Sequence, residues 1–138
     1  MNAYPRELRG VAISERLNAF IHGATWRLID GPTHQHELLR RQLMAGRVES
    51  VELTGVGLIA KFAVPESCPL VEPAELIGGE GSIAASGLDL SAGCLVKVAG
   101  GRLAFLEVYT FGAVPWPDEP TMVALSEFTP LEIPSPAS

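Results

Sequence analysis

The spacing of apolar residues changes near position 47 of this 138-residue chain. In the range 13–21 apolar residues recur at intervals of three and four, which predicts an amphipathic helix with a plausible end at Gly23. A second helix is predicted between a cap at Thr33 and a stop at Gly46. The intervening Trp26–Ile29 segment fits a strand, a helical turn or an extended link.

After position 47 apolar residues alternate with polar ones between glycines and prolines, a pattern typical of strands. The clearest prediction is a hairpin over 93–111, because the two-residue Gly100-Gly101 loop suits a type I′ turn. A regular register opposes Val96 to Phe105 and Cys94 to Glu107. The face then expected to lie under the helices carries Val96, Val98, Leu103, Phe105, Tyr109 and Phe111, and the other face includes Leu106 and Val108.

These elements predict an α+β fold, with two N-terminal helices on one face of an antiparallel sheet of about five strands. We expect one domain over 1–138: a helical layer in 1–47, the sheet in 48–128, and an extended or frayed proline-rich tail in 129–138. Hydrophobic residues make up 47% of the chain, so one core can form without disulfides or a structural metal.

Charge and targeting signals narrow the classes of partner. The net charge is −6, which disfavours nucleic acid or an anionic membrane. Residues 1–47 carry a net +3 and residues 48–138 a net −9. We interpret this as a basic helical layer docked on an acidic sheet, the alternative being an acidic face presented to a basic partner. No secretory signal or membrane-spanning run is recognised, which favours the cytoplasm.

The cysteines and histidines give little sign of catalysis. Cys68 and Cys94 lack a C-x-x-C spacing, so reduced thiols are expected, with Cys94 as a small buried hydrophobe. His34 and His36 lie two apart on a predicted helix and point in different directions, and His22 is on another element. We therefore expect solvent-facing histidines, no metal site and no cofactor.

Glu107 and Trp116 are the residues of most interest. The predicted register places Glu107 on the apolar face near Phe105 and Tyr109, where a carboxylate kept from water would be a candidate general acid, base or ligand contact. Alternatively, the strand ends there, or Glu107 pairs with an arginine of the helical layer. Trp116, in a rigid Pro-Trp-Pro turn, is expected to plug one end of the sheet, the alternative being a ligand platform.

Two stretches of the second half carry short motifs. The first is Thr54-Gly55-Val56-Gly57 followed by Lys61-Phe62. The second is Gly101-Arg102-Leu103 followed by Leu106-Glu107-x-Tyr109, Gly112 and Trp116-Pro117. Over about residues 48–117 the chain resembles a family of small uncharacterised bacterial cytoplasmic α+β proteins, from which it departs in having an apolar hairpin face with little aspartate. The resemblance implies N-terminal helices before a strand-rich half and brings no known activity.

No reaction motif is recognised, which favours a non-catalytic function while leaving an enzyme open. We expect a bacterial module that binds a protein partner or forms a homo-oligomer such as a homodimer, with an immunity-type inhibitor as one option. The sheet edges and the Leu106 and Val108 face would be available for such pairing. The alternative is a small-molecule-binding or hydrolytic protein with a pocket between helices and sheet. There Glu107 would be the acid or base, and Tyr109 or Trp116 would shape the wall.

Overall fold

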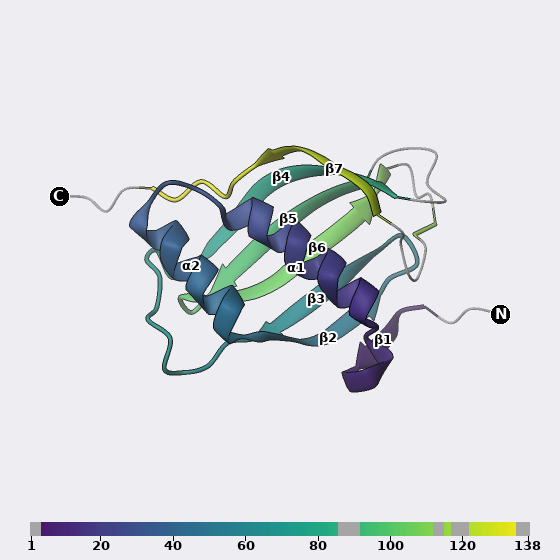
Figure 1. The fold of residues 1–138 in the computed structure, drawn as a ribbon, viewed down its shortest axis with the longest axis horizontal. Coiled ribbons are helices and arrows are strands. Elements are labelled where there is room, and N and C mark those ends of the chain that lie inside the picture. Colours follow the sequence, from purple (N-terminus) through teal and green to yellow (C-terminus); the bar gives the residue numbers. More distant parts are fainter. Residues whose placement is uncertain (1–3, 86–91, 112–114, 117–121, 135–138) are drawn as a thin grey trace.

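The computed structural model describes residues 4–85, 92–111, 115–116 and 122–134, and it confirms the α+β class (Figure 1). Two helices lie on one face of an antiparallel sheet whose seven strands follow the order β1-β2-β3-β6-β5-β4-β7. The strands are β1 (Arg6–Arg9), β2 (Arg47–Leu53), β3 (Gly57–Ala63), β4 (Leu76–Ala85), β5 (Ala92–Ala99), β6 (Arg102–Thr110) and β7 (Met122–Thr129).

The expected number of about five strands was too low. One strand that was not anticipated is β1, which precedes the helices within the range assigned to the helical layer and pairs with β2 at the edge of the sheet. Its four residues include three charged side chains and only Leu8 as an apolar one. Such a short charged edge strand has too little apolar alternation to be recognised from the pattern. A 3-10 turn, η1 (Gly10–Ala12), follows it.

Helix α1 (Glu15–Ile29) runs through Gly23 and includes the Trp26–Ile29 segment, so Gly23 is not its end. Its buried positions continue the helical period from Leu17 to Leu28. Packing of that face therefore outweighs the cost of an interior glycine, about 1 kcal/mol relative to alanine. Helix α2 (His34–Ala45) begins after the predicted cap, since the Thr33 hydroxyl accepts a hydrogen bond from the His36 amide.

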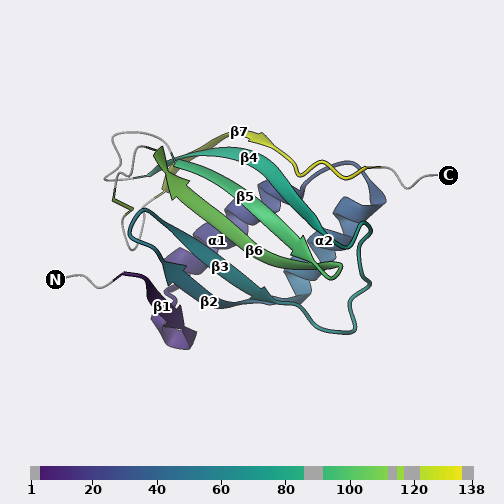
Figure 2. The same cartoon turned by 180° about the vertical axis from the view of Figure 1, so that it is seen from behind.

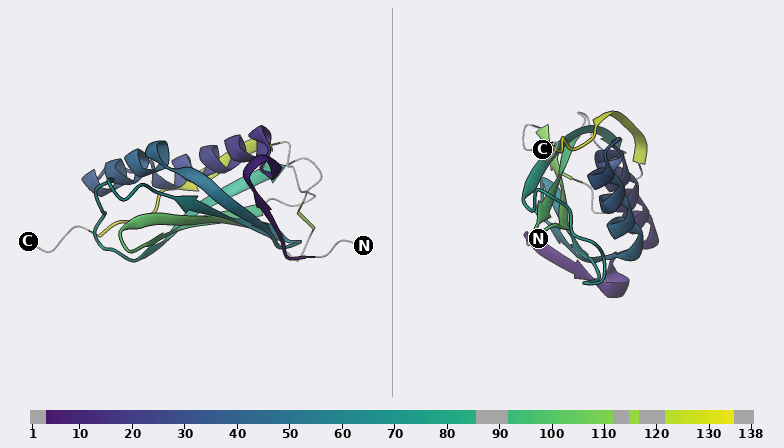
Figure 3. Two further views of the ribbon diagram at one scale, coloured as in Figure 1. Left: turned by 90° about the horizontal axis from the view of Figure 1, so that it is seen from below. Right: turned by 90° about the vertical axis from the view of Figure 1, so that its left-hand side faces the viewer.

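The sheet curls around the two helices, which occupy its concave side (Figure 3). Seen from behind, the convex side shows strands with no described element over them (Figure 2). Helices and concave sheet face share one core. Its largest fully buried apolar side chains are Leu17, Ile21, Leu28, Ile29, Leu39, Leu53, Leu58, Ile83, Leu103, Leu106 and Leu131.

The β5–β6 hairpin has the predicted turn but a different register. Gly100 and Gly101 both have positive φ, at 59° and 78°. Ala99 opposes Arg102 and Val98 opposes Leu103 as expected. The ladder then shifts by one residue, with Ala104 as the extra residue of a β-bulge. Beyond it the pairs are Lys97 with Phe105, Val96 with Leu106, Leu95 with Glu107, and Cys94 with Val108.

This shift reverses the predicted faces of β6 beyond the bulge, whereas Leu103 before it stays in the core as predicted. Leu106 and Val108 are buried under the helices, so the face expected to be free for pairing is the core. Phe105 and Tyr109, which were expected in the core, lie on the convex side, and Phe111 is exposed. A one-residue slip moves each following side chain to the other face, because strand side chains alternate.

The C-terminal segment, predicted to be extended or frayed, is extended and anchored as far as Pro134. The Leu131 amide donates to the Leu28 carbonyl at 2.7 Å, and the Leu131 carbonyl lies 2.6 Å from Nε2 of His36. Leu131 and Ile133 are both buried. His36 is therefore buried and anchors this segment, so its predicted exposure to solvent was wrong.

Gln42 fixes α2 to the hairpin from inside the core. Its amide nitrogen donates to the carbonyls of Pro69 at 2.9 Å and Gly101 at 3.0 Å. Its side-chain oxygen accepts from the Leu103 amide, beside the bulge, at 2.8 Å. All the polar atoms of a fully buried side chain are thus used.

Candidate functional site

The convex face of the sheet brings together two of the three residues singled out from the sequence. Glu107 and Tyr109 both lie on β6, the strand between β3 and β5. Their neighbours follow from the strand pairing and the alternation of side chains. Three rows cross these strands: Lys61–Phe105–Lys97, Ile59–Glu107–Leu95 and Gly57–Tyr109–Gly93. We call this set the convex patch.

Glu107 is partly exposed, between two aliphatic side chains of the convex patch. The helices cover the opposite side of the sheet (Figure 3). Glu107 therefore does not face a pocket between helices and sheet, as the hydrolytic hypothesis required. That placement was wrong because the bulge at Ala104 reverses the face on which Glu107 lies.

Tyr109 lies across the neighbouring strand because that strand has a glycine opposite it. A Cβ on Gly93 would come within 2.6–2.7 Å of the hydroxyl end of the Tyr109 ring. The ring also meets Phe111 edge to face, with centroids 5.9 Å apart. Burial raises the pKa of the Tyr109 hydroxyl, with further contributions from the charges of Cys94, Glu80 and Glu107. This hydroxyl is therefore a neutral hydrogen-bonding group near pH 7.

A pocket of about 430 Å³ opens beside Tyr109, towards β4 and β7. We call it the edge pocket. Two carboxylates and two aromatic rings are among its walls, and none of its lining residues is a lysine or arginine. It is lined by Glu80, Gly81, Ser82, Gly93, Tyr109, Phe111, Glu127 and Thr129.

Sequence reasoning missed the edge pocket. The glycine-rich run 78–81 is not followed by the Lys-Ser/Thr pair of a phosphate-binding loop, so it matches no known binding motif. The strands do bulge there, between Gly78 and Gly81 on the β5 side and between Glu80 and Ser82 on the β7 side. A glutamate inside a glycine-rich strand was the available signal, since glycines within strands accompany bulges and close approaches.

Trp116 lies on the other side of the sheet from the convex patch. Its ring packs against Phe20 of α1 at a centroid distance of 5.8 Å, and its amide donates to the Gly55 carbonyl at 3.1 Å. The side chain is buried, in keeping with a plug at one end of the sheet. Within the described chain its indole nitrogen has no hydrogen-bond partner. Trp116 therefore does not form one site with Glu107 and Tyr109.

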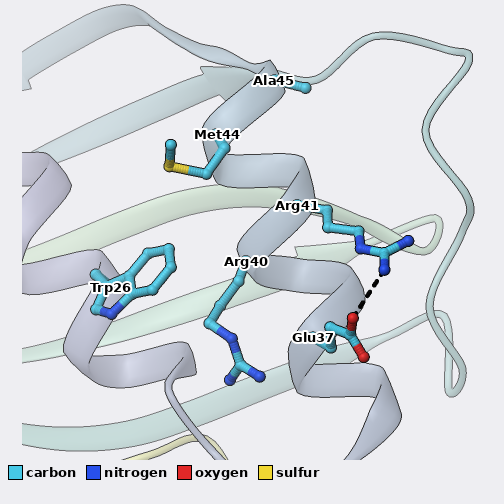
Figure 4. A pocket seen from close by; sticks show the side chains of 6 residues that line it. All are labelled: Trp26, Glu37, Arg40, Arg41, Met44 and Ala45. Atoms are coloured by element: carbon cyan, nitrogen blue, oxygen red, sulfur yellow. Dashed lines mark hydrogen bonds and ion pairs between the residues drawn. The ribbon is translucent and has the colours of Figure 1, made fainter.

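A second surface site, absent from the sequence reading, lies between the helices (Figure 4). This groove measures about 520 Å³, and Trp26 of α1 faces Met44 of α2 across it. Its arginines are engaged locally: Arg41 pairs with Glu37 at 2.8 Å. Arg40 donates to the carbonyls of Gly31 at 2.8 Å and Ile29 at 3.3 Å, at the C-terminal end of α1.

A smaller pocket of about 120 Å³ does lie between the helices and the sheet. It contains none of the three predicted site residues. Its walls are Asn18, His22, Leu43, Gly46, Arg47, Val48 and Phe62. His22 itself stacks on Trp26, with ring centroids 6.5 Å apart.

The remaining candidates give no reactive centre. Cys94 is a buried free thiol, as predicted, and its burial raises its pKa to about 12. On the neighbouring strand it opposes Val108 rather than Glu107. Among the described residues, no three His, Cys, Asp or Glu side chains are grouped to hold a metal ion. Within the residues that the structure describes, neither helix is long and apolar enough to cross a bilayer.

Comparison with known proteins returned nothing: no family model, no curated protein and no solved structure matches this chain. The resemblance to small bacterial cytoplasmic proteins therefore stays a prediction. The function has to be argued from the two faces of the sheet and the pockets described above.

Proposed function

We propose that the chain is a non-catalytic protein-binding module that docks through the convex patch. The observation that carries this proposal is a whole sheet face with no described covering layer (Figure 2). By strand register and alternation, apolar side chains lie in the centre of that face. Ile59, Leu95 and Phe105 are only partly buried there, and Ile77 on β4 is 61% exposed. Exposed apolar groups edged by charged ones are typical of protein interaction surfaces.

The curvature of the sheet favours a different protein over a second copy. Two convex faces touch only along their crests, whereas a stable interface buries roughly 1,200–2,000 Å². A partner with a concave surface can follow the curl of the sheet and bury more of the patch. This shape suits an inhibitor or immunity-type protein, which covers a cleft in its target.

A reducing compartment such as the bacterial cytoplasm is part of the proposal. Both cysteines are free thiols, with Cys94 buried and Cys68 partly exposed. Chains from oxidising compartments more often use their cysteines in disulfides. The bacterial origin depends on the resemblance alone.

The proposal is tested by a charge placed in the centre of the patch. Phe105→Glu should abolish capture of the partner from an extract of the source organism, because a carboxylate would be buried at the interface. Met44→Glu is the matched control, since Met44 is an exposed apolar residue on the helical side. Mass spectrometry identifies the captured protein, and calorimetry with that purified protein measures both variants.

We expect a binding loss of tenfold or more for Phe105→Glu and little change for Met44→Glu. A partner that binds both variants equally, or that is lost only with Met44→Glu, contradicts docking through the convex patch. Thermal unfolding of both variants shows whether a loss of binding comes from a loss of fold.

A further inference from the structure

The edge pocket adds a chemical requirement for the partner, and this inference rests on the proposed function. The pocket adjoins the convex patch, because Tyr109 and Gly93 belong to both. A partner lying over the patch would therefore reach the pocket with a protruding side chain. The walls decide which side chain that is.

One wall is flat and aromatic. The Tyr109 ring rests over Gly93 and meets Phe111 edge to face. Both residues remain accessible, at 36% and 46% exposure. Gly93 leaves room for the Tyr109 ring to lie against its strand. The exposed aromatic surface of the two rings attracts cations through the ring quadrupole.

The opposite wall is acidic. Glu80 lies on β4 opposite Thr129, and Glu127 is on β7, where the pairing of the two strands is irregular. Glu127 has φ of 53°, in the left-handed region that glutamate rarely adopts. Within the described chain neither carboxylate takes part in an ion pair, and no cation lines the pocket.

We propose that the edge pocket receives an arginine side chain of the partner protein. A guanidinium is planar, so it can stack on the aromatic wall while its N–H groups reach both carboxylates. The hydroxyls of Ser82 and Thr129 offer further acceptors. Anions are disfavoured by the two glutamates, and a hard metal ion needs more carboxylate ligands than the described residues group together.

The test uses the whole protein and a small probe. N-acetyl-arginine amide is titrated into labelled protein and followed by NMR shifts of the edge-pocket amides. N-acetyl-citrulline amide is the neutral isostere, and N-acetyl-lysine amide is the other cation. We expect shifts confined to the edge pocket, with citrulline at least tenfold and lysine at least threefold weaker than arginine.

Two variants and one matched control complete the test. The double variant Glu80→Gln, Glu127→Gln should weaken binding of the arginine probe at least tenfold. The variant Phe111→Leu, which removes the aromatic ring but keeps an apolar side chain, should weaken it several-fold. The control, Glu49→Gln with Glu66→Gln, makes the same charge change at two exposed glutamates outside the edge pocket. Equal binding of arginine and citrulline or of arginine and lysine, or an equal loss in the control, overturns the assignment.

This result is separable from the proposed function because the probe requires no partner. If the Phe105→Glu variant keeps its partner while wild type binds the arginine probe, docking through the convex patch fails and the pocket stands. If the identified partner binds the Glu80→Gln, Glu127→Gln variant as tightly as wild type, the arginine assignment fails and the docking surface stands.

Discussion

Gln42 joins helix α2 to the β5–β6 hairpin by side-chain hydrogen bonds. Replacing it by leucine keeps a similar volume but leaves the Pro69 carbonyl and the Leu103 amide without their partner. A buried polar group left unsatisfied costs ~1–3 kcal/mol, so we expect Gln42→Leu to lower the free energy of unfolding by about 3 kcal/mol. The Gly101 carbonyl suffers less, since it also accepts from Val71.

Urea unfolding followed by circular dichroism measures this loss, and Gln35→Leu is the control. Gln35 makes one exposed hydrogen bond, to the Glu72 amide at 2.8 Å. Its replacement should cost no more than ~1 kcal/mol. Equal losses for the two variants would mean that the three hydrogen bonds of the Gln42 side chain contribute nothing specific.

Cys94 should be unreactive while the protein is folded. The thiolate is the reacting species, and burial raises the pKa of Cys94 to about 12, so almost none is present at pH 8. Ellman's reagent should modify Cys68, which is partly exposed, and spare Cys94 until the chain unfolds. Cys68→Ser should therefore abolish fast labelling, and fast labelling that persists in this variant contradicts the assignment.

The raised pKa of Cys94 also determines how the stability of the fold changes with pH. A thiol whose pKa is raised in the folded state favours its protonated form there. This contribution is complete below the ordinary thiol pKa, and it declines as the pH rises towards the folded-state value of about 12. Cys94→Ala should flatten the decline in unfolding free energy between pH 9 and the alkaline limit of the fold, relative to wild type.

The sequence predicted the burial or capping role of single residues better than it predicted which distant residues they contact. Cys94 as a buried thiol and Thr33 as a cap follow from residue type and position alone. His36 and Gln42 could not be anticipated in the same way. Their partners, Leu131 and Leu103, lie 95 and 61 residues away, and no local pattern indicates such long-range contacts.

Among the elements, the β5–β6 hairpin shows where prediction from sequence ends. Its turn is encoded locally by two adjacent glycines, and the structure has it there. The bulge at Ala104 is not encoded in that way, because both faces of β6 carry large apolar side chains. Either register would bury an apolar set, so alternation could not decide which set faces the helices.

The C-terminal segment behaves as an element of the core. Leu131 and Ile133 are buried, and the Leu131 backbone joins α1 to α2 through Leu28 and His36. Leu131→Ala should therefore lower the free energy of unfolding by about 3 kcal/mol, within the range for truncating a buried leucine. Chemical denaturation measures it, with the exposed neighbour substitution Glu132→Ala as the control. A loss as small as that of the control contradicts the anchoring role.

At the scale of the molecule, the ion pairs of the described residues lie within the two halves of the chain rather than between the basic and the acidic half. The described core between helices and sheet is mainly apolar. Arg40 pairs with Asp30 within the helical layer, and Lys97 pairs with Glu75 within the sheet half. Each of these pairs joins opposite charges of the same half, so it leaves the net charge of that half unchanged. The net charge of each half can act on an approaching partner at long range.

The curl of the sheet predicts the state of the molecule in solution. Because two convex faces share little area, self-association through the convex patch should be weak, and the protein should be a monomer at micromolar concentration. Size-exclusion chromatography with light scattering measures this directly. A dimer that Phe105→Glu dissociates and Met44→Glu leaves intact would show that the patch fits a second copy after all. The homodimer expected from the sequence would then replace the separate partner, whereas a dimer unaffected by either variant would lie elsewhere on the surface.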